Sequence, residues 1–370
     1  MNHLLRNTIL AIFLFAGMQA YPQEAIDTIP VNAVPSEAAH SEKLNPTELI
    51  MEHLADAYEW HITTFKETHI SIPLPVIVKG KESGWHIFSS SRFEHGHAEY
   101  QGFYIAEQGD YKGKIVEKDA SDAEVRPLDF SLTKNAFSLL LSSCVLIILI
   151  MSCARWYKQR QGKPEEASPK GFVGMIEMLI MSIVDDVVKP CIGKNYKRYT
   201  PYLLTVFFFI FLNNLLGIIP IFPGGANVTG NIAITSVLAI FTFVIVNIFG
   251  TKEYWKEIFW PDVPVFLKAF PLMPIIEIIG MFTKPFALMI RLFANILAGH
   301  AIVLGLTCMI FLTVSMGTAM NAGMSALSVI MTIFIDFVEL LVAFIQAYVF
   351  TILSAVFIGL SQVEPHHVKS

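Results

Sequence analysis

The stretch Glu277-Ile-Ile-Gly-Met-Phe-Thr-Lys284-Pro-Phe-Ala-Leu-Met-Ile-Arg291-Leu-Phe-Ala-Asn295 places charged and polar side chains inside an otherwise apolar run. An ionised side chain in the middle of a bilayer costs at least ~2.5–3.5 kcal/mol, so such residues usually mark a transport pathway. The four polar positions are seven, seven and four residues apart, so at about 100° per residue they share one helical face. The stretch therefore predicts a long intramembrane helix with one polar face.

The composition of the whole chain places this helix in a membrane protein. The 370 residues are 54% hydrophobic and 15% charged, with a mean hydropathy of +0.55. We expect an all-α polytopic membrane protein with a small extramembrane domain. The cysteines stand at no metal-ligand spacing, so we expect no metal, no disulfide framework and no cofactor.

The first 134 residues differ from the rest in composition. Residues 1–20 have the pattern of a signal peptide, with Arg6 before a short apolar core, and we expect cleavage after Ala20 rather than an uncleaved anchor. Residues 21–134 are predicted to form an exported, periplasmic domain of α+β or β-rich structure. Its histidines, such as His95 and His97, could bind a metal, but surface histidines are the favoured interpretation.

Five apolar segments are expected to cross the membrane, at residues 135–153, 201–219, 231–249, 269–312 and 322–361. Nine Lys or Arg between Arg155 and Arg198 predict that the loop 154–200 is cytoplasmic, and the tail 362–370 is expected on the same side. Within that loop, residues from Ser168 to about Lys189 predict an amphipathic helix. It would lie in the membrane interface or pack on a cytoplasmic partner.

The last two segments are too long to cross upright. A straight helix over residues 269–312 would measure about 65 Å, against a hydrocarbon core of about 30 Å. We therefore expect both segments to be tilted or bent, with a bend at Pro285, and a turn at Ser315–Asn321 between them.

The final segment supplies acidic partners for the polar helix. Glu339 and Gln346 are seven residues apart and share a face, and Asp336 lies one turn before Glu339. His300 is nine residues after Arg291, so it points to the other side of the helix and could meet Glu339. Such a pair predicts either a proton relay or a neutral contact that joins two helices.

Several amides and one hydroxyl in the middle spans are further candidates for a water route. For each of them alone, an ordinary interhelical hydrogen bond is the favoured interpretation. These candidates are Asn213, Asn214, Asn231 and Thr235.

Three motifs together resemble subunit a of F-type ATP synthase. They are Arg291-Leu-Phe-Ala-Asn-Ile-Leu-Ala-Gly-His300, Asn214-Leu-Leu-Gly-Ile-Ile-Pro220 and Glu339 followed after six residues by Gln346-Ala-Tyr-Val-Phe350. The resemblance covers roughly residue 201 to the C-terminus, so it assigns no role to the exported domain. It implies a stator channel in a bacterial inner membrane, beside a rotating ring of c subunits and bound to peripheral-stalk b subunits.

The resemblance also implies roles for individual residues. Arg291 corresponds to the family's essential arginine, which would force the ring carboxylate to release its proton and would block a short circuit between two aqueous half-channels. Asn295 and Gln346 accompany it, His300 and Glu339 form the inlet, and Glu277 lies on the exit side. Further channel candidates are Lys284, Asn231, Asn214 and Asp336.

Other classes of function have weaker sequence support. An independent secondary ion transporter or antiporter would also contain intramembrane charges, but no inverted repeat is visible. Intramembrane protease motifs are absent, and no phosphate-binding loop is present, so we expect no direct ATP binding and no catalysis by the chain alone. Nucleic acid is not an expected partner.

Overall fold

The computed structural model describes residues 55–259 and 272–362, apart from short gaps at 66–67, 82–83, 97, 107, 110, 119–122, 161–168 and 220–223. The expected signal peptide and residues 363–370 of the expected tail lie outside the described residues.

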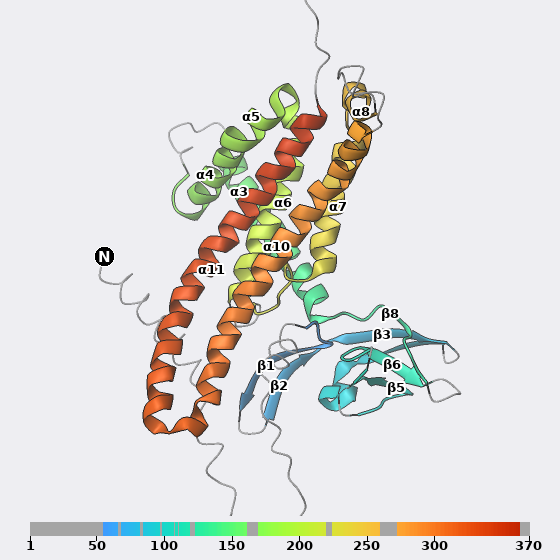
Figure 1. The fold of residues 1–370 in the computed structure, drawn as a ribbon, viewed down its shortest axis with the longest axis vertical. Helices are drawn as coiled ribbons and strands as arrows, with labels where there is room; N and C mark the ends of the chain where they lie inside the picture. The colour runs from blue at the N-terminus through green and yellow to red at the C-terminus, as the bar shows by residue number, and fades with distance from the viewer. Residues whose placement is uncertain are drawn as a thin grey trace, which may run out of the picture. The chain divides into compact units, whose positions relative to one another are not determined.

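The described N-terminal region is a module of short antiparallel sheets. Val76 and Val78 of strand β3 are fully buried, and they pack with Phe93, Phe103 and Ile115 into a small core. Within the module, Figure 1 shows β3 lying over β6 and β5. The pairs are β1–β2, β4–β3–β8 and β5–β6–β7. The elements are β1 (Glu59–Phe65), β2 (Thr68–Pro73), β3 (Pro75–Gly80), β4 (Gly84–Ser89), the 3₁₀ helix η2 (Ser90–Gly96), β5 (Phe103–Ile105), β6 (Ile115–Lys118), β7 (Glu124–Val125) and β8 (Leu128–Asp129).

Buried polar contacts join the ends of this module. The Tyr58 hydroxyl donates to the Asp129 carboxylate and accepts from the Ile115 amide. Burial, and then the hydrogen bond to Asp129, raise the pKa of Tyr58 well above its ordinary value. The phenol therefore stays protonated at neutral pH and remains a donor to the carboxylate.

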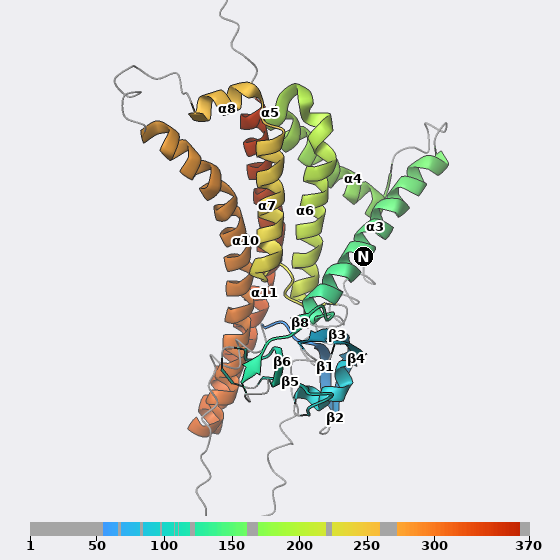
Figure 2. The ribbon, with the colours of Figure 1, turned by 90° about the vertical axis from the view of Figure 1, so that its right-hand side faces the viewer.

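The rest of the described chain is mostly helical (Figures 1 and 2). Among the described residues, four helical segments are long and apolar enough to cross a membrane, or five if α7 and α8 form one span with a 98° bend. The elements are α3 (Lys134–Arg160), α4 (Phe172–Ser182), the π-helical turn η4 (Ile183–Val188), α5 (Lys189–Ile192), η5 (Gly193–Asn195), α6 (Tyr196–Ile218), α7 (Ile232–Ile248), α8 (Lys252–Phe259), α10 (Leu272–Leu312), η6 (Val314–Met316) and α11 (Thr318–Ser361).

The turn between the last two helices is shorter than expected. Gly317, at φ +102°, makes the break, and α11 already begins at Thr318 rather than at residue 322. Only glycine adopts this backbone conformation without strain. Residues Thr318 to Asn321 have ordinary helical backbone and belong to the first turn of α11. The expected turn at Ser315–Asn321 was therefore wrong at its C-terminal side.

Two other helices extend beyond their apolar segments. Helix α3 continues to Arg160, whereas the sequence predicted that this segment ends at residue 153. Helix α6 begins at Tyr196 and includes Pro201, whereas the sequence predicted a start at residue 201. Apolar content marks only the part of a helix inside hydrocarbon. The backbone hydrogen bonds continue through the charged turns on either side.

The expected amphipathic helix is divided into three pieces. Helix α4 begins after Gly171 and leads into the π-helical turn η4, which ends next to Pro190 of α5. Proline lacks the N–H that would continue an α-helical ladder, and π turns are a known response to such breaks. Val187 and Val188 of η4 are fully buried, so this segment packs on the helices of its own chain.

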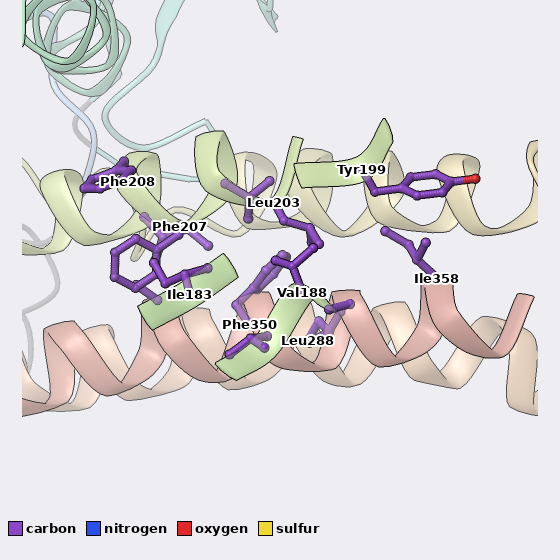
Figure 3. Packing of buried hydrophobic residues seen from close by; sticks show 14 of the residues in the cluster. Ile183, Val188, Tyr199, Leu203, Phe207, Phe208, Leu288, Phe350 and Ile358 are labelled. Atoms are coloured by element: carbon purple, nitrogen blue, oxygen red, sulfur yellow. The ribbon is translucent and has the colours of Figure 1, made fainter. Parts of the chain in front are cut away.

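The main helical core lies between α6 and α11 and takes side chains from η4 and α10. Figure 3 shows Leu203 and Phe207 of α6 facing Phe350 of α11, with Leu288 of α10 beside Phe350. Leu203 and Phe207 are completely buried. This packing fixes α10 and α11 against α6, which positions the polar residues described below.

Helices α10 and α11 are long partners in a hairpin. At 41 and 44 residues they would measure about 61 and 66 Å if straight, about twice the hydrocarbon thickness. Pro285 lies inside α10. Figure 2 shows the N-terminal part of α10 curving away from α11, as expected of a helix that contains a proline.

We predict that Gly359→Ala loosens the packing of α5 on α11. An added Cβ would lie 2.0 Å from the carbonyl oxygen of Cys191, a backbone atom that cannot move aside easily. Overpacking of this kind costs about 1–3 kcal/mol. The alkylation rate of Cys191, measured in a chain that lacks the other cysteines, should therefore rise.

The matched control is Gly323→Ala on the same helix, where an added Cβ would meet nothing within 4 Å. Equal alkylation rates in the two variants would contradict the close approach of α5 and α11.

Candidate functional site

The polar residues of α10 lie on an accessible side of the helix. Arg291 and Asn295, one turn apart, are both exposed, whereas Leu288, Leu292 and Ile296 are buried in or beside the core. Because the leucines and the isoleucine repeat every four residues, they form the stripe that packs on the protein. The packing of this stripe leaves Arg291 facing away from the core.

Arg291 has no acidic partner within the part of the chain that the structure describes. Phe286 and Ile290, close to it in the sequence, are also exposed, so the accessible surface of this part of α10 is largely apolar. Guanidinium stays protonated in proteins and cannot escape this environment by losing its charge. A charge of this kind needs a partner, which here would have to come from another subunit or from water.

The other charges of α10 have different surroundings. The Lys284 ammonium lies 5.8 Å from the ring centroid of Phe357 on α11, a cation–π contact within the chain. Glu277 is partly buried near the start of α10, where α8 packs beside it. Of the two cations of α10, Lys284 thus has a cation–π contact within the described structure, whereas Arg291 has none.

His300 and Glu339 meet between α10 and α11. The distance from His300 Nδ1 to Glu339 Oε1 is 3.4 Å, and the Glu339 side chain is 6% exposed. Among the described residues, Glu339 Oε1 has no partner with full hydrogen-bond geometry. A buried carboxyl oxygen with spare hydrogen-bonding capacity, next to an imidazole, is suited to accept and release a proton.

Two glycines make room for this pair. A Cβ on Gly299 would lie 2.7 Å from Glu339 Oε1, and a Cβ on Gly217 of α6 would lie 3.6 Å from His300 Nε2. The carboxyl therefore occupies space that any other residue at 299 would fill. The sequence analysis did not predict that these two glycines make space for the pair. In the dipeptide Gly299-His300, a residue without a side chain next to a titratable residue could have indicated it.

The remaining acid and amide of α11 lie close to Glu339 in sequence. Gln346 is buried two turns further on, and Asp336 is partly buried one turn before. Glu339 and Gln346 are thus on the buried side of α11, together with Ala343 and Ala347. The buried polar side chains of this helix face the interior of the bundle, whereas Arg291 faces outward from α10.

The amides of the middle helices are engaged within the protein. Asn214 donates from Nδ2 to the Ala343 carbonyl at 3.2 Å and accepts at Oδ1 from the Thr229 hydroxyl at 2.7 Å, and both hydrogen bonds are buried. Asn231 caps α7 by accepting from the Ala233 amide at 2.9 Å. The sequence gives no indication of this role of Thr229, because a threonine in a loop can be assigned a hydrogen bond only when its partner is known.

The described residues contain no group of three or more His, Cys, Asp or Glu that could hold a metal. The arrangement instead has two parts on different sides of α10. One is an exposed, permanently charged guanidinium, and the other is a buried histidine–carboxyl contact. The buried stripe of Leu288, Leu292 and Ile296 separates the two sides.

Comparisons with known proteins show the family of the chain. A family profile described as ATP synthase A chain matches residues 137–359. A second profile, described as a domain of unknown function (DUF8433), matches residues 49–130.

Relatives with curated names cover most of the chain. The protein named ATP synthase subunit a 2 of Chlorobaculum tepidum is 35% identical over 91% of this chain and 82% of its own length. The ATP synthase subunit a of Chlorobium phaeobacteroides is 43% identical over 65% of this chain and 67% of its own length. That of an Anaeromyxobacter species is 32% identical over 90% and 74%. The chain therefore belongs to the ATP synthase A chain family, the proton-translocating stator subunits of ATP synthases.

Proposed function

We propose that Arg291 is the fixed charge that meets the carboxylates of a rotating ring of c subunits. The supporting observation is an exposed guanidinium in an apolar surface, without an acidic partner among the described residues. The family assignment supplies the partner class and sets aside an independent secondary transporter as the alternative.

Elementary electrostatics explains how such a charge moves protons. A carboxylic acid that faces lipid is desolvated, which raises its pKa and keeps it neutral. When it comes within about 4 Å of a guanidinium, at an effective dielectric constant of about 20, the attraction is about 4 kcal/mol. This favours the ionised acid by roughly a thousandfold, so the acid releases its proton beside Arg291.

The geometry of α10 supports two separate proton routes. His300 and Glu339 would form the entry route from the outside, and Glu277 the exit route to the cytoplasm. The 23 residues from Glu277 to His300 correspond to about 35 Å of helix, with Arg291 between them. Because Arg291 does not give up its own proton, a proton could pass between the routes only by travelling on the ring.

The remaining polar residues would position this machinery. Asn214 ties α6 to α11 one turn from Glu339, and Asn231 fixes the start of α7. Asn295 would face the ring beside Arg291. Gln346 and Asp336 would set the local field around Glu339.

We also propose the orientation of the chain in a bacterial inner membrane. Five crossing segments, counting α7 with α8 as one, would place the β-rich module in the periplasm and the C-terminus in the cytoplasm, beside the b subunits. The nine Lys or Arg between Arg155 and Arg198 support a cytoplasmic loop after α3. Residues 1–20 would be the signal peptide that exports the module.

We predict that Arg291→Ala abolishes ATP-driven proton pumping in inverted membrane vesicles, because the ring carboxylate would no longer be made to ionise. Arg291→Lys should also fail to pump in a coupled way, since an ammonium enclosed between the chain and the ring can lose its proton. Acidification is measured with a pH-sensitive dye.

Ile290→Ala, at the neighbouring exposed position, is the matched control and should pump normally. Coupled pumping at the control rate in Arg291→Ala vesicles would contradict the proposed role.

We predict that Gly299→Ala slows passive proton conduction through vesicles stripped of the ATP-hydrolysing subunits. The added Cβ would force the Glu339 carboxyl, 2.7 Å away, out of its contact with His300. Gly305→Ala, on the same helix, meets nothing within 4 Å and should conduct normally.

The amount of assembled subunit is measured in both glycine variants, so that a lost complex is not mistaken for a blocked route. Equal conduction at equal assembly would show that the carboxyl does not need this space.

A further inference from the structure

The β-rich module exposes an apolar surface that the proton route does not use. Trp85 and Ile87 of β4 are 59% and 73% exposed, and Leu128 and Phe130, in and just after β8, are 62% and 63% exposed. Together with Ile77 of β3, we call these five residues the outer patch. They come from all three strands of one sheet.

The strand register makes the outer patch continuous. Ile77 is paired with Ile87, and Lys79 is paired with both Trp85 and Leu128. The rings of Trp85 and Phe130 lie 5.8 Å apart across the sheet. Alternate residues of a strand point to opposite faces, so these side chains share the face opposite to the buried Val76 and Val78.

The module does not need the outer patch for its own core. Val76 and Val78 pack inward on Phe93, Phe103 and Ile115, on the other face of the same sheet. Large contiguous apolar surfaces are rare on soluble domains and mark interaction sites. The outer patch therefore requires an occupant.

Backbone hydrogen bonds hold the outer patch next to a membrane-crossing helix. Phe130 donates to the Ile77 carbonyl at 2.9 Å, and Leu132 donates to the Pro75 carbonyl at 3.0 Å. Two residues later, Lys134 begins α3 and donates to the Ala57 carbonyl at 2.8 Å. The four steps along the chain from Phe130 to Lys134 span at most about 14 Å, so this sheet cannot move far from the start of α3.

Further contacts brace the module at this position. The backbone N–H of Asn135 donates to Asp56 Oδ1 at 3.0 Å. The ring of Trp60 packs edge-on against the ring of Phe137 of α3, with 5.9 Å between the ring centroids. Trp60 also packs with Ala226 and Val228, in the connection between α6 and α7. The module is thus held at two points of the helical region rather than by one flexible linker.

The chemistry of the outer patch matches a lipid interface. Tryptophan is enriched where membrane meets water, because its ring is amphipathic. The Lys79 ammonium lies 5.7 Å from the ring centroid of Trp85, and Lys79 stands between Trp85 and Leu128 on the central strand. Lysine can bury its methylene chain in apolar surface while its ammonium reaches a phosphate group.

We propose that the outer patch docks on the outer leaflet of the bilayer, with Trp85 and Phe130 at the boundary between headgroups and acyl chains and Lys79 at the phosphates. The occupant is lipid rather than a protein, because the patch continues directly into a membrane-crossing helix and carries interfacial residue types. The module then extends the membrane contact of α3 over the bilayer surface, which limits the tilt of that helix.

The test is site-directed spin labelling of the full chain in liposomes of phosphatidylethanolamine and phosphatidylglycerol. The native cysteines are replaced by serine, and single labels are placed by Ile87→Cys and, independently, Leu128→Cys on the other edge strand. Both side chains are exposed, so neither change disturbs the core. Gln108→Cys, exposed in a loop of the same module, is the control.

Accessibility to oxygen, which partitions into lipid, is compared with accessibility to a water-soluble nickel chelate. Lipid docking predicts an oxygen-to-nickel ratio several-fold higher at 87 and 128 than at 108, and a decrease of that ratio at 87 when Trp85→Glu is added. Ratios equal to the control would show a patch in water and would overturn the proposal. Low accessibility to both reagents would show that protein covers the patch, and this would overturn it too.

Discussion

A guanidinium cannot discard its charge, and the rest of the membrane region is arranged around that constraint. Arg291 lies on an exposed part of an apolar helix, without an acidic partner in the described structure. A permanent charge in this position is costly unless an acid or water reaches it. In the function that we propose, the long hairpin of α10 and α11, packed on α6, would hold that charge at a fixed place where a mobile carboxylate can arrive.

The second constraint is the space around Glu339. A buried carboxyl group is tolerated when its neighbours leave room for it and offer a proton partner. Gly299 and Gly217 provide the room, and His300 lies 3.4 Å from Oε1. Asn214 fixes the adjacent wall by joining α6 to the Ala343 carbonyl of α11. The contact between His300 and Glu339 thus depends on close helix packing as much as on the two titratable residues.

The extramembrane module adds a different kind of membrane contact. Its core is small, and its connection to α3 consists of backbone hydrogen bonds and the packing of Trp60 on Phe137. In the arrangement that we propose, these contacts hold the module at the bilayer surface. An apolar sheet face in that place lowers the free energy of the assembly when lipid covers it.

The sequence by itself determined the membrane class, the long polar helix, the shared face of its charged residues and the family resemblance. Each of these follows from hydropathy and a fixed helical period, which are properties of neighbours along the chain. The sequence also predicted that His300 faces Glu339, because nine residues turn a helix by half a circle.

The ends of the helices were harder to predict from the sequence. Hydropathy detects neither the positive φ at Gly317 nor the charged turns that extend α3 and α6. Only the tertiary structure decided that Gly299 makes space for the Glu339 carboxyl and that the Thr229 hydroxyl donates a hydrogen bond to Asn214. It also decided that Lys284 makes a cation–π contact with Phe357, whereas Arg291 makes none in the described structure. Those facts depend on which helices pack together, and packing brings into contact residues whose separation in the sequence carries no signal.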